Sequence, residues 1–252
     1  MRCGPSWYTP VSMRVFVILP AAGIGTRMSA VSGTPTPKQF LSLGGVPVLV
    51  HCLRTFMAVP RVQTIYVAVQ KREIERVREQ IDEFQLGDRV RVVEGGDVRQ
   101  QSVSNALHQI VHENRCGDDD IILVHDAARP LIDGATIDRT IDAIAEHGAA
   151  IVGMPAVDTI KQVDRTARGA IITATIPRER IVQAQTPQGA RCGILQRAYA
   201  DSLADGFTGT DEASVLERAG IEVAVVAGSP RNFKITQPGD LELAEFYLRS
   251  SK

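Results

Sequence analysis

The chain has 252 residues, of which 44% are hydrophobic and 23% are charged, and its formal net charge at pH 7 is −1. These values are ordinary for a globular protein, and they exclude a disordered chain, a collagen-like repeat and a coiled coil. A nearly neutral chain has no overall electrostatic attraction to nucleic acid or to an anionic membrane, so any phosphate that it binds requires a local cluster of charge.

The N-terminus and the cysteines give expectations about the cellular compartment. Residues 1–12 lack the apolar stretch of a secretory signal, and we expect them to form a flexible tail before a single domain at 13–252. The four cysteines include no Cys-x-x-Cys pair, which argues against a disulfide framework and against a thiolate zinc site. We therefore expect reduced thiols in a cytoplasmic protein, with no apolar run long enough to cross a membrane.

Short β-branched runs alternate with longer amphipathic segments along most of the chain. The runs predict buried strands at residues 14–19, 62–69, 89–93, 120–124, 149–152 and 221–226. Apolar residues at spacings of three and four predict helices near residues 74–84, 103–111 and 137–144. Strands this apolar, separated by helices, indicate an α/β protein with a mostly parallel, doubly wound sheet.

The segment from Asp158 to Gln185 breaks this alternation because it has no helical pattern. Two β-prone runs, 159–163 and 170–176, predict a hairpin within an arm at about 156–184. A hairpin that protrudes from a covered sheet needs another surface against which to pack. A partner chain is one candidate and the arm's own domain is the alternative.

The first predicted strand ends in a glycine-containing loop at residues 20–28. Small residues after a parallel strand let backbone N–H groups approach an anion. A Walker loop requires Gly-Lys-Ser/Thr, which is absent, and a dinucleotide fingerprint requires a small residue where Met28 stands. Two interpretations stay open: a plain βα turn, or a long open loop with cations at Arg27 and Lys38 that suits a nucleoside triphosphate.

Polar residues also follow other predicted strands. Asp126 comes directly after the fourth strand, where open α/β sheets bind ligands, and it predicts either a Mg²⁺ ligand or a turn-forming residue. Gly95, Gly96, Asp97 and Ser102 surround the start of a helix. They predict either a pocket for a flat base such as cytosine or a tight turn at the helix N-terminus.

Eight motifs in chain order resemble one known family. They are Ala-Ala-Gly-x-Gly-x-Arg-Met at 21–28, Pro-Lys-Gln at 37–39, Gly-Gly-Asp-x-Arg-x-x-Ser-Val at 95–103, His-Asp-Ala-Ala-Arg-Pro at 125–130, Asp-Thr-Ile-Lys at 158–161, Gln-Thr-Pro-Gln at 185–188, Thr-Asp-Glu-Ala at 210–213 and Asn-x-Lys-Ile-Thr at 232–236. In this order they are similar to the 2-C-methyl-D-erythritol 4-phosphate cytidylyltransferases of the non-mevalonate isoprenoid pathway. The resemblance runs from about Arg14 to Leu248, nearly the whole chain.

The resemblance implies a Rossmann-like sheet and a homodimer in which the arm of each chain reaches the site of its partner. It implies transfer of a cytidylyl group from CTP to 2-C-methyl-D-erythritol 4-phosphate, with release of pyrophosphate and with Mg²⁺ or another divalent cation as cofactor. The catalytic residues that it implies are Arg27, Lys38 and Lys234. The implied contacts with CTP are Ala21, Ala22, Gly23, Gly25, Arg27, Lys38, Gly96, Asp97 and Ser102.

The implied contacts with the sugar phosphate come from two chains. From the same chain as the CTP site they are Asp126, which would also bind the metal, Ala127, Arg129, Thr210 and Lys234. From the partner they are Asp158, Thr159, Arg178 and Thr186. Two features depart from the family: the stretch 29–36 is longer than the usual link to Pro-Lys-Gln, and residues 1–12 have no counterpart.

The implied chemistry needs no strong base, because a phosphate monoester is already ionised near neutral pH. The barrier is repulsion between anions, which the cations of the site offset. Two alternatives stay open. A ribitol-5-phosphate cytidylyltransferase has the same fold and chemistry but usually a different pair in place of Ala127-Ala128. A catalytically silent nucleotide-binding module would have lost Lys38, Lys234 or Asp126.

Overall fold

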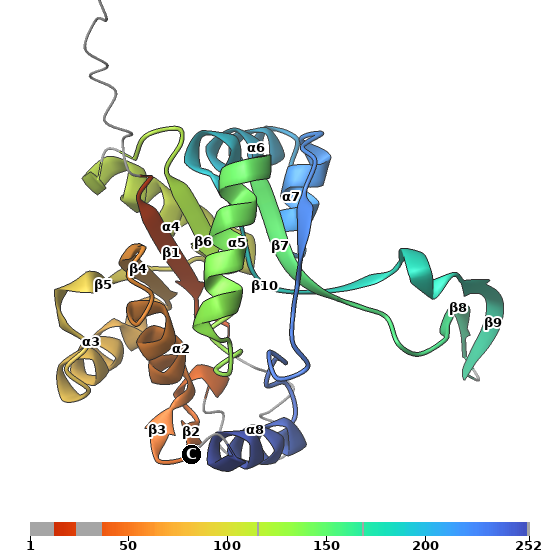
Figure 1. The fold of residues 1–252 in the computed structure, drawn as a ribbon, viewed down its shortest axis with the longest axis horizontal. Helices are drawn as coiled ribbons and strands as arrows, with labels where there is room; N and C mark the ends of the chain where they lie inside the picture. The colour runs from red at the N-terminus through yellow and green to blue at the C-terminus, as the bar shows by residue number, and fades with distance from the viewer. Residues whose placement is uncertain (1–12, 24–36, 115, 168, 251–252) are drawn as a thin grey trace, which may run out of the picture.

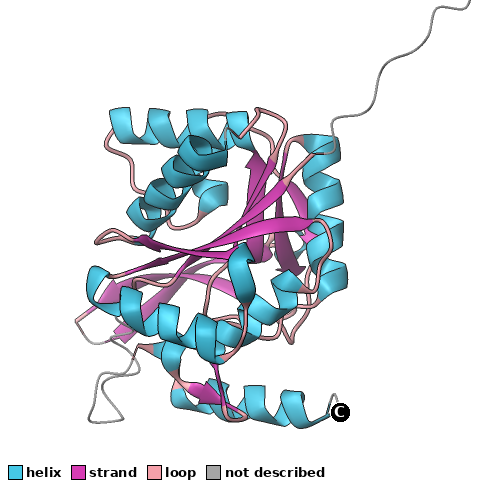
Figure 2. Cartoon of the chain, turned by 90° about the vertical axis from the view of Figure 1, so that its left-hand side faces the viewer, coloured by secondary structure: helices cyan, strands magenta, loops and turns pink. Residues whose placement is uncertain are grey.

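The computed structural model describes residues 13–23, 37–114, 116–167 and 169–250. Within these ranges the chain forms a central seven-stranded sheet between two layers of helices (Figures 1 and 2). The strand order is β11-β7-β10-β6-β1-β4-β5. The strands are β1 (Val15–Pro20), β4 (Val62–Val69), β5 (Val90–Glu94), β6 (Ile121–Val124), β7 (Ala149–Pro155), β10 (Val182–Arg191) and β11 (Ala224–Ala227).

Most neighbouring strands in this sheet are parallel. β1 pairs in parallel with β4 and β6, β4 with β5, and β7 with β11. β10 is the exception, because it runs antiparallel to both of its neighbours, β6 and β7. The prediction of a Rossmann-like, mostly parallel sheet is therefore confirmed, although it did not include β10.

The two helical layers follow from the alternation of side chains along the strands. In β1, Val15, Val17 and Leu19 contribute to one core cluster with α2, α3 and α5, whereas Phe16 and Ile18 contribute to the other with α4, α6 and α7. The helices are α2 (Val48–Met57), α3 (Ile74–Glu83), α4 (Arg99–Asn114), α5 (Gly134–His147), α6 (Cys192–Ala204), α7 (Glu212–Arg218) and α8 (Pro238–Ser250). No helix in the described part of the chain is both long and apolar enough to cross a membrane.

The predicted elements differ from the observed ones mainly at the C-terminal end. The helices expected near 74–84, 103–111 and 137–144 are α3, α4 and α5. The last predicted strand, 221–226, is shorter and displaced, since β11 begins only at Ala224.

The predicted hairpin is present and projects from the body of the molecule (Figure 1). β8 (Ile160–Thr166) pairs antiparallel with β9 (Gly169–Ile176) in a sheet of their own. The hairpin exposes apolar side chains, and Ile171 and Ile172 are 63% and 61% exposed. Water is a poor environment for two such neighbouring residues, so this surface is suited to contact with another protein surface.

Candidate active site

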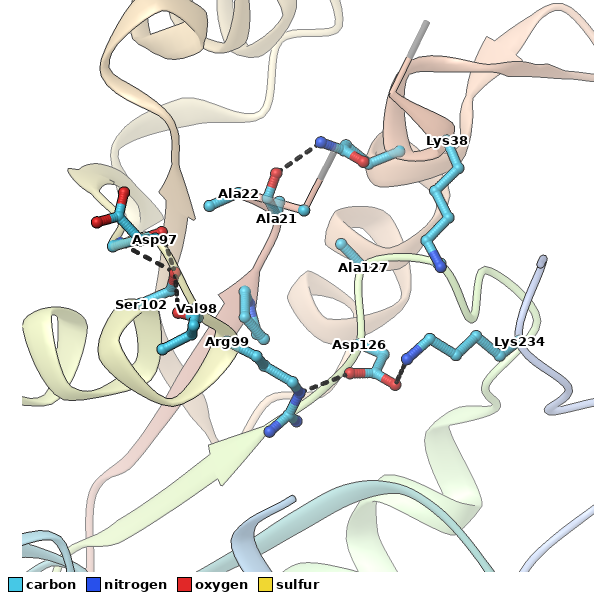
Figure 3. Close-up of a pocket in the computed structure, with 15 residues that line it drawn as sticks. Ala21, Ala22, Lys38, Asp97, Val98, Arg99, Ser102, Asp126, Ala127 and Lys234 are labelled. Carbon is cyan, nitrogen blue, oxygen red and sulfur yellow. Dashed lines mark hydrogen bonds and ion pairs between the residues drawn. The ribbon is translucent and has the colours of Figure 1, made fainter. Parts of the chain in front are cut away.

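A pocket opens at the carboxyl ends of β1, β5 and β6, where parallel sheets bind ligands (Figure 3). Three of its walls are the segments that follow these strands. The others are the short helix η1 (Lys38–Phe40) and the segment after β11. The lining residues are Pro20, Ala21, Ala22, Gly23, Lys38, Gln39, Gly96, Asp97, Val98, Arg99, Ser102, Asp126, Ala127, Ala128 and Lys234.

The segment after β1 forms a wall of small residues. The amide of Gln39 donates a 2.6 Å hydrogen bond to the carbonyl of Ala21, and the N–H of Ala21 donates to the carbonyl of Ala68 at 2.7 Å. These bonds hold the backbone in place while Ala21 and Ala22 bring only methyl groups to the pocket. Lys38 lies beside this wall and directs its ammonium group into the pocket (Figure 3).

Two of the predicted triphosphate contacts, Gly25 and Arg27, lie outside the described residues, as does the longer stretch 29–36. Their roles stay predictions. Of the three predicted catalytic cations, Arg27, Lys38 and Lys234, the structure therefore places Lys38 and Lys234, which line the same pocket.

The turn after β5 approaches the wall of small residues closely. A Cβ atom on Gly95 would lie 2.9 Å from the Cβ of Ala22 and 3.0 Å from the hydroxyl oxygen of Ser102, so no larger residue fits. The buried hydroxyl of Ser102 accepts a 3.0 Å hydrogen bond from the N–H of Gly96 and lies 3.1 Å from the carbonyl of Val98. Ser102 therefore shapes the turn itself, which holds Gly96 and Asp97 at the mouth of the pocket.

We expect Ser102→Ala to raise the KM for CTP roughly tenfold and to leave the KM for the sugar phosphate nearly unchanged. The substitution leaves the Gly96 N–H without its acceptor, which costs on the order of 1–2 kcal/mol. Steady-state kinetics with each substrate varied in turn would measure both constants. An equal rise in the two would contradict a role in the nucleotide half of the pocket.

Asp126, directly after β6, is held by three cations from separate parts of the chain. Its Oδ2 lies 2.7 Å from Lys234 Nζ and its Oδ1 lies 3.1 Å from Arg99 Nε (Figure 3). Arg129 Nε lies 3.7 Å from Oδ2. Burial raises the pKa of Asp126, but the charges of Arg99 and Lys234 outweigh it and hold the pKa far below its usual range. Asp126 is thus ionised, and the surrounding cations make the floor of the pocket attractive to anions.

Hydrogen bonds anchor the segment that carries Lys234. The N–H of Ile235, a fully buried residue, donates to the carbonyl of Ala128 at 2.8 Å. The buried amide of Asn232 donates to the carbonyl of Thr186 at 2.8 Å, and Arg129 Nη1 donates to the carbonyl of Asn232 at 2.7 Å. Lys234 therefore approaches Asp126 from a fixed backbone.

Thr186, on β10 of the same chain, holds the backbone of Asp126 in place. Its hydroxyl accepts the N–H of Asp126 at 3.0 Å and lies 3.0 Å from Nδ1 of the buried His125, whose Nε2 lies 3.0 Å from the carbonyl of Arg129. Because the hydroxyl of Thr186 accepts the N–H of Asp126, its own proton can be donated to Nδ1 of His125. Nε2 of His125 then carries the ring proton and donates it to the carbonyl of Arg129. The expectation that Thr186 comes from a partner chain is wrong, because its side chain is 3% exposed and is bonded within its own chain.

We expect stability to fall by about 2 kcal/mol between pH 7 and pH 5 through His125 alone. Burial lowers the pKa of His125 from 6.5 to about 4, so the unfolded chain takes up a proton in this range and the folded chain does not. Its contribution is present above pH 6.5 and is lost as the pH falls towards 4.

Urea unfolding of wild type and of His125→Gln at both pH values isolates this effect. The glutamine amide can still donate to the carbonyl of Arg129, and it does not titrate. The variant should therefore lose about 2 kcal/mol less than wild type over the same interval. Equal losses in the two proteins would show that His125 does not resist protonation in the fold.

The remaining predicted substrate contacts lie in two places. Ala127 lines the pocket and Arg129 contacts Asp126. Thr210 is exposed just before α7, outside the set of described residues that line the pocket. Asp158, Thr159 and Arg178 are exposed on the arm, which leads away from the pocket of its own chain (Figure 1).

Arg99 and Glu212 are site residues that sequence reasoning did not single out. Arg99 reaches Asp126 from the first position of α4, and Glu212 is fully buried against Arg99. Both belong to the motifs given above, Arg99 to 95–103 and Glu212 to 210–213, but the resemblance assigned neither of them a role. The sequence does contain a signal for Glu212. It is a second acidic residue, directly after the capping Asp211, in a segment otherwise rich in small residues.

The expectation that Asp126 binds a metal ion does not fit this arrangement. Both carboxylate oxygens are engaged by cationic groups, and a divalent cation at either oxygen would lie against Lys234 or Arg99. In the described part of the chain, no three His, Cys, Asp or Glu side chains gather as a metal-binding group. A divalent cation in this pocket therefore has to be held mainly by phosphate oxygens.

Comparisons with known proteins agree with these observations. The family model of IspD, 2-C-methyl-D-erythritol 4-phosphate cytidylyltransferase, matches residues 15–250. A relative of that name from Acidobacterium capsulatum is 68% identical over 94% of this chain and 98% of its own. Another from Solibacter usitatus is 50% identical over 94% of this chain and 96% of its own.

Solved structures show the same similarity. A crystal structure of 4-diphosphocytidyl-2C-methyl-D-erythritol synthase superposes with a TM-score of 0.78 at 30% identity, covering 94% of this chain and 100% of that one. The 2-C-methyl-D-erythritol 4-phosphate cytidylyltransferase of Francisella tularensis superposes with a TM-score of 0.76 at 34% identity, covering 92% and 99%.

Proposed function

The chain belongs to the 2-C-methyl-D-erythritol 4-phosphate cytidylyltransferase family, and we propose that the pocket at the carboxyl ends of β1, β5 and β6 is where it performs the family's reaction. It is a nucleotidyltransferase, which transfers the cytidylyl group of CTP to 2-C-methyl-D-erythritol 4-phosphate and releases pyrophosphate. The observation that supports this location is that one pocket combines a glycine turn, two lysines and a buried carboxylate.

The two halves of the pocket suit the two substrates. We place the cytosine base against Ala22 and the Gly96–Asp97 turn, which line the same pocket. The triphosphate then extends past Lys38 towards Lys234. The sugar phosphate lies over Ala127 and Asp126, whose carboxylate can accept a hydrogen bond from a substrate hydroxyl group.

The reaction then depends on placement and charge. A phosphate oxygen of methylerythritol phosphate attacks the α-phosphorus of CTP in line, and the bond from that phosphorus to the pyrophosphate oxygen breaks. The attacking oxygen of a phosphate monoester is already ionised near neutral pH, so the site needs no general base. Lys38 and Lys234 oppose the negative charge that gathers around the reacting phosphorus.

A divalent cation belongs to this proposal as part of the nucleotide substrate. Mg²⁺ commonly keeps several waters and binds through substrate phosphates, and the cation-filled surroundings of Asp126 favour that mode here. Its role when bound to the triphosphate would be to neutralise part of the phosphate charge.

The proposal includes a homodimer in which each arm completes its partner's site. It is supported by the exposed Ile171 and Ile172 on the hairpin, and by the way the hairpin projects from the body of the molecule (Figure 1). Arg178 is not among the described residues that line the pocket. We also propose that the enzyme works in the cytoplasm, which suits the unpaired thiols of Cys52, Cys116 and Cys192.

The test is release of pyrophosphate by the purified protein with CTP and Mg²⁺, comparing methylerythritol 4-phosphate with ribitol 5-phosphate. We expect turnover with the first and a product of the mass of 4-diphosphocytidyl-2-C-methyl-D-erythritol. Preference for ribitol 5-phosphate would assign the chain to the alternative acceptor. Absence of turnover with either, despite CTP binding, would indicate a silent nucleotide-binding module.

A further inference from the structure

A largely buried network of ion pairs and hydrogen bonds adjoins the pocket, and the reaction described above assigns it no role. Glu212 is 0% exposed and receives both terminal nitrogens of Arg99, at 2.7 Å and 2.8 Å. The hydroxyl of the buried Tyr199 donates to the same carboxylate at 3.1 Å. The third nitrogen of the guanidinium group, Nε, donates to Asp126 at 3.1 Å.

The position of Glu212 is itself fixed from the sheet. Glu212 is the first residue of α7, which begins with a capping box formed by Asp211 and Ser214. The side chain of Gln188, on β10, donates to the carboxylate of Asp211 at 2.9 Å and accepts the N–H of Ala213 at 3.0 Å. The carboxylate of Glu212 therefore has little freedom to move.

The geometry also limits what Arg99 can do. A guanidinium group is planar, so a two-pronged contact with Glu212 sets the direction in which Nε points. Glu212 occupies the end-on fork formed by the two terminal nitrogens of Arg99, so that fork is not offered to a phosphate, although Arg99 lines the pocket. What remains for Arg99 is to orient the carboxylate of Asp126, whose other oxygen receives Lys234 at 2.7 Å.

We propose that Glu212 and Arg99 are positioning residues that fix the carboxylate of Asp126, and with it the ammonium group of Lys234, for the sugar phosphate. This inference rests on the proposed function, because it assigns Asp126 and Lys234 to the acceptor half of the site. If the pair Arg99–Glu212 belongs to the active site, its loss changes the kinetics with the sugar phosphate. A pair that served stability alone would leave the substrate affinities unchanged.

The test is the kinetics of Glu212→Gln, which keeps the shape of the side chain but removes its charge. We expect kcat/KM for methylerythritol phosphate to fall at least about tenfold, with the KM for CTP changed less than about threefold. Arg99→Lys should give the same pattern, because a lysine keeps the charge but cannot contact Glu212 and Asp126 together. Tyr199→Phe, which leaves the Arg99–Glu212 contact intact, should lose only about two- to threefold.

Asp120→Asn is the matched control. It breaks another ion pair with a largely buried carboxylate, Arg14–Asp120 at 2.6 Å, at the opposite ends of β1 and β6 from the pocket. This variant should lower the thermal midpoint and leave both KM values unchanged. The midpoints of all variants would be measured alongside the kinetics.

Each outcome decides between the proposals. A wild-type protein without transferase activity would overturn the proposed function. An active wild type with unchanged kinetics in Glu212→Gln or in Arg99→Lys would overturn the positioning role alone, and a rise confined to the KM for CTP would show instead that Arg99 binds the nucleotide. If Glu212→Gln does not fold, the kinetics of Arg99→Lys give the same decision.

Discussion

Lys234→Ala is expected to lower kcat by about two to four orders of magnitude, because it removes a cation directed at the charge that develops on the reacting phosphates. Lys234 lies 2.7 Å from Asp126 and lines the pocket opposite Lys38. Its side chain is 35% exposed and belongs to a loop, so the fold should survive the change. Lys38→Ala should have an effect of similar size for the same reason.

Pyrophosphate release at saturating substrates would measure kcat, and circular dichroism would verify the fold. Arg78→Ala is a suitable control, since it removes an exposed cation that pairs with Glu75 on α3. That variant should keep wild-type turnover. Turnover near the wild-type value in Lys234→Ala would remove this residue from the mechanism.

A mixture of two inactive variants, Arg178→Ala and Lys234→Ala, is expected to recover about one quarter of wild-type activity. The hairpin of the arm projects from the body of the molecule (Figure 1), and the guanidinium group of Arg178 donates to the carbonyl of Val157 at 2.6 Å within the arm. If Arg178 acts in the partner's pocket, one of the two sites in a mixed dimer contains both lesions and the other contains none. Random exchange makes about half of the dimers mixed, which gives the quarter.

Co-expression with two different affinity tags would isolate the mixed dimer and prove that it forms. The matched control is a mixture of Lys38→Ala with Lys234→Ala. Both lysines line the same pocket of one chain, so every site in that mixture is damaged and no activity should return. If the isolated mixed dimer of the first pair is also inactive, the shared site is wrong, while the transferase assignment stands.

The sequence predicted the parts of the fold that have a strong local signal. β1, β4 and β6 are short β-branched runs buried on both faces, and α3 and α5 have clear helical spacing. β10 gave no such signal, because its buried residues include Gln185, Thr186 and Gln188, whose burial depends on distant hydrogen-bonding partners.

The residues of the site also divide into those with a local sequence signal and those without one. Loop residues such as Gly96, Lys38 and Lys234 belong to recognisable motifs, and the structure brings them into one pocket. The contact of Arg99 with Glu212 joins residues 113 positions apart, and no periodicity along the chain encodes such a pair. For the same reason Thr186 was assigned to the wrong chain: its motif was visible, but the strand that places it under Asp126 was not.

The convergence of cations on Asp126 has a consequence for how this protein matures. Arg99, Arg129 and Lys234 lie 27, 3 and 108 positions away along the chain, so Lys234 is synthesised long after Asp126. Closing loops of that length costs entropy that is recovered only when the rest of the molecule is packed. A nascent chain can therefore contain most of its sheet and still lack the assembled active site around Asp126. We therefore expect catalytic competence only in chains that extend past Lys234, because a fragment that ends before it lacks a cation that lines the pocket.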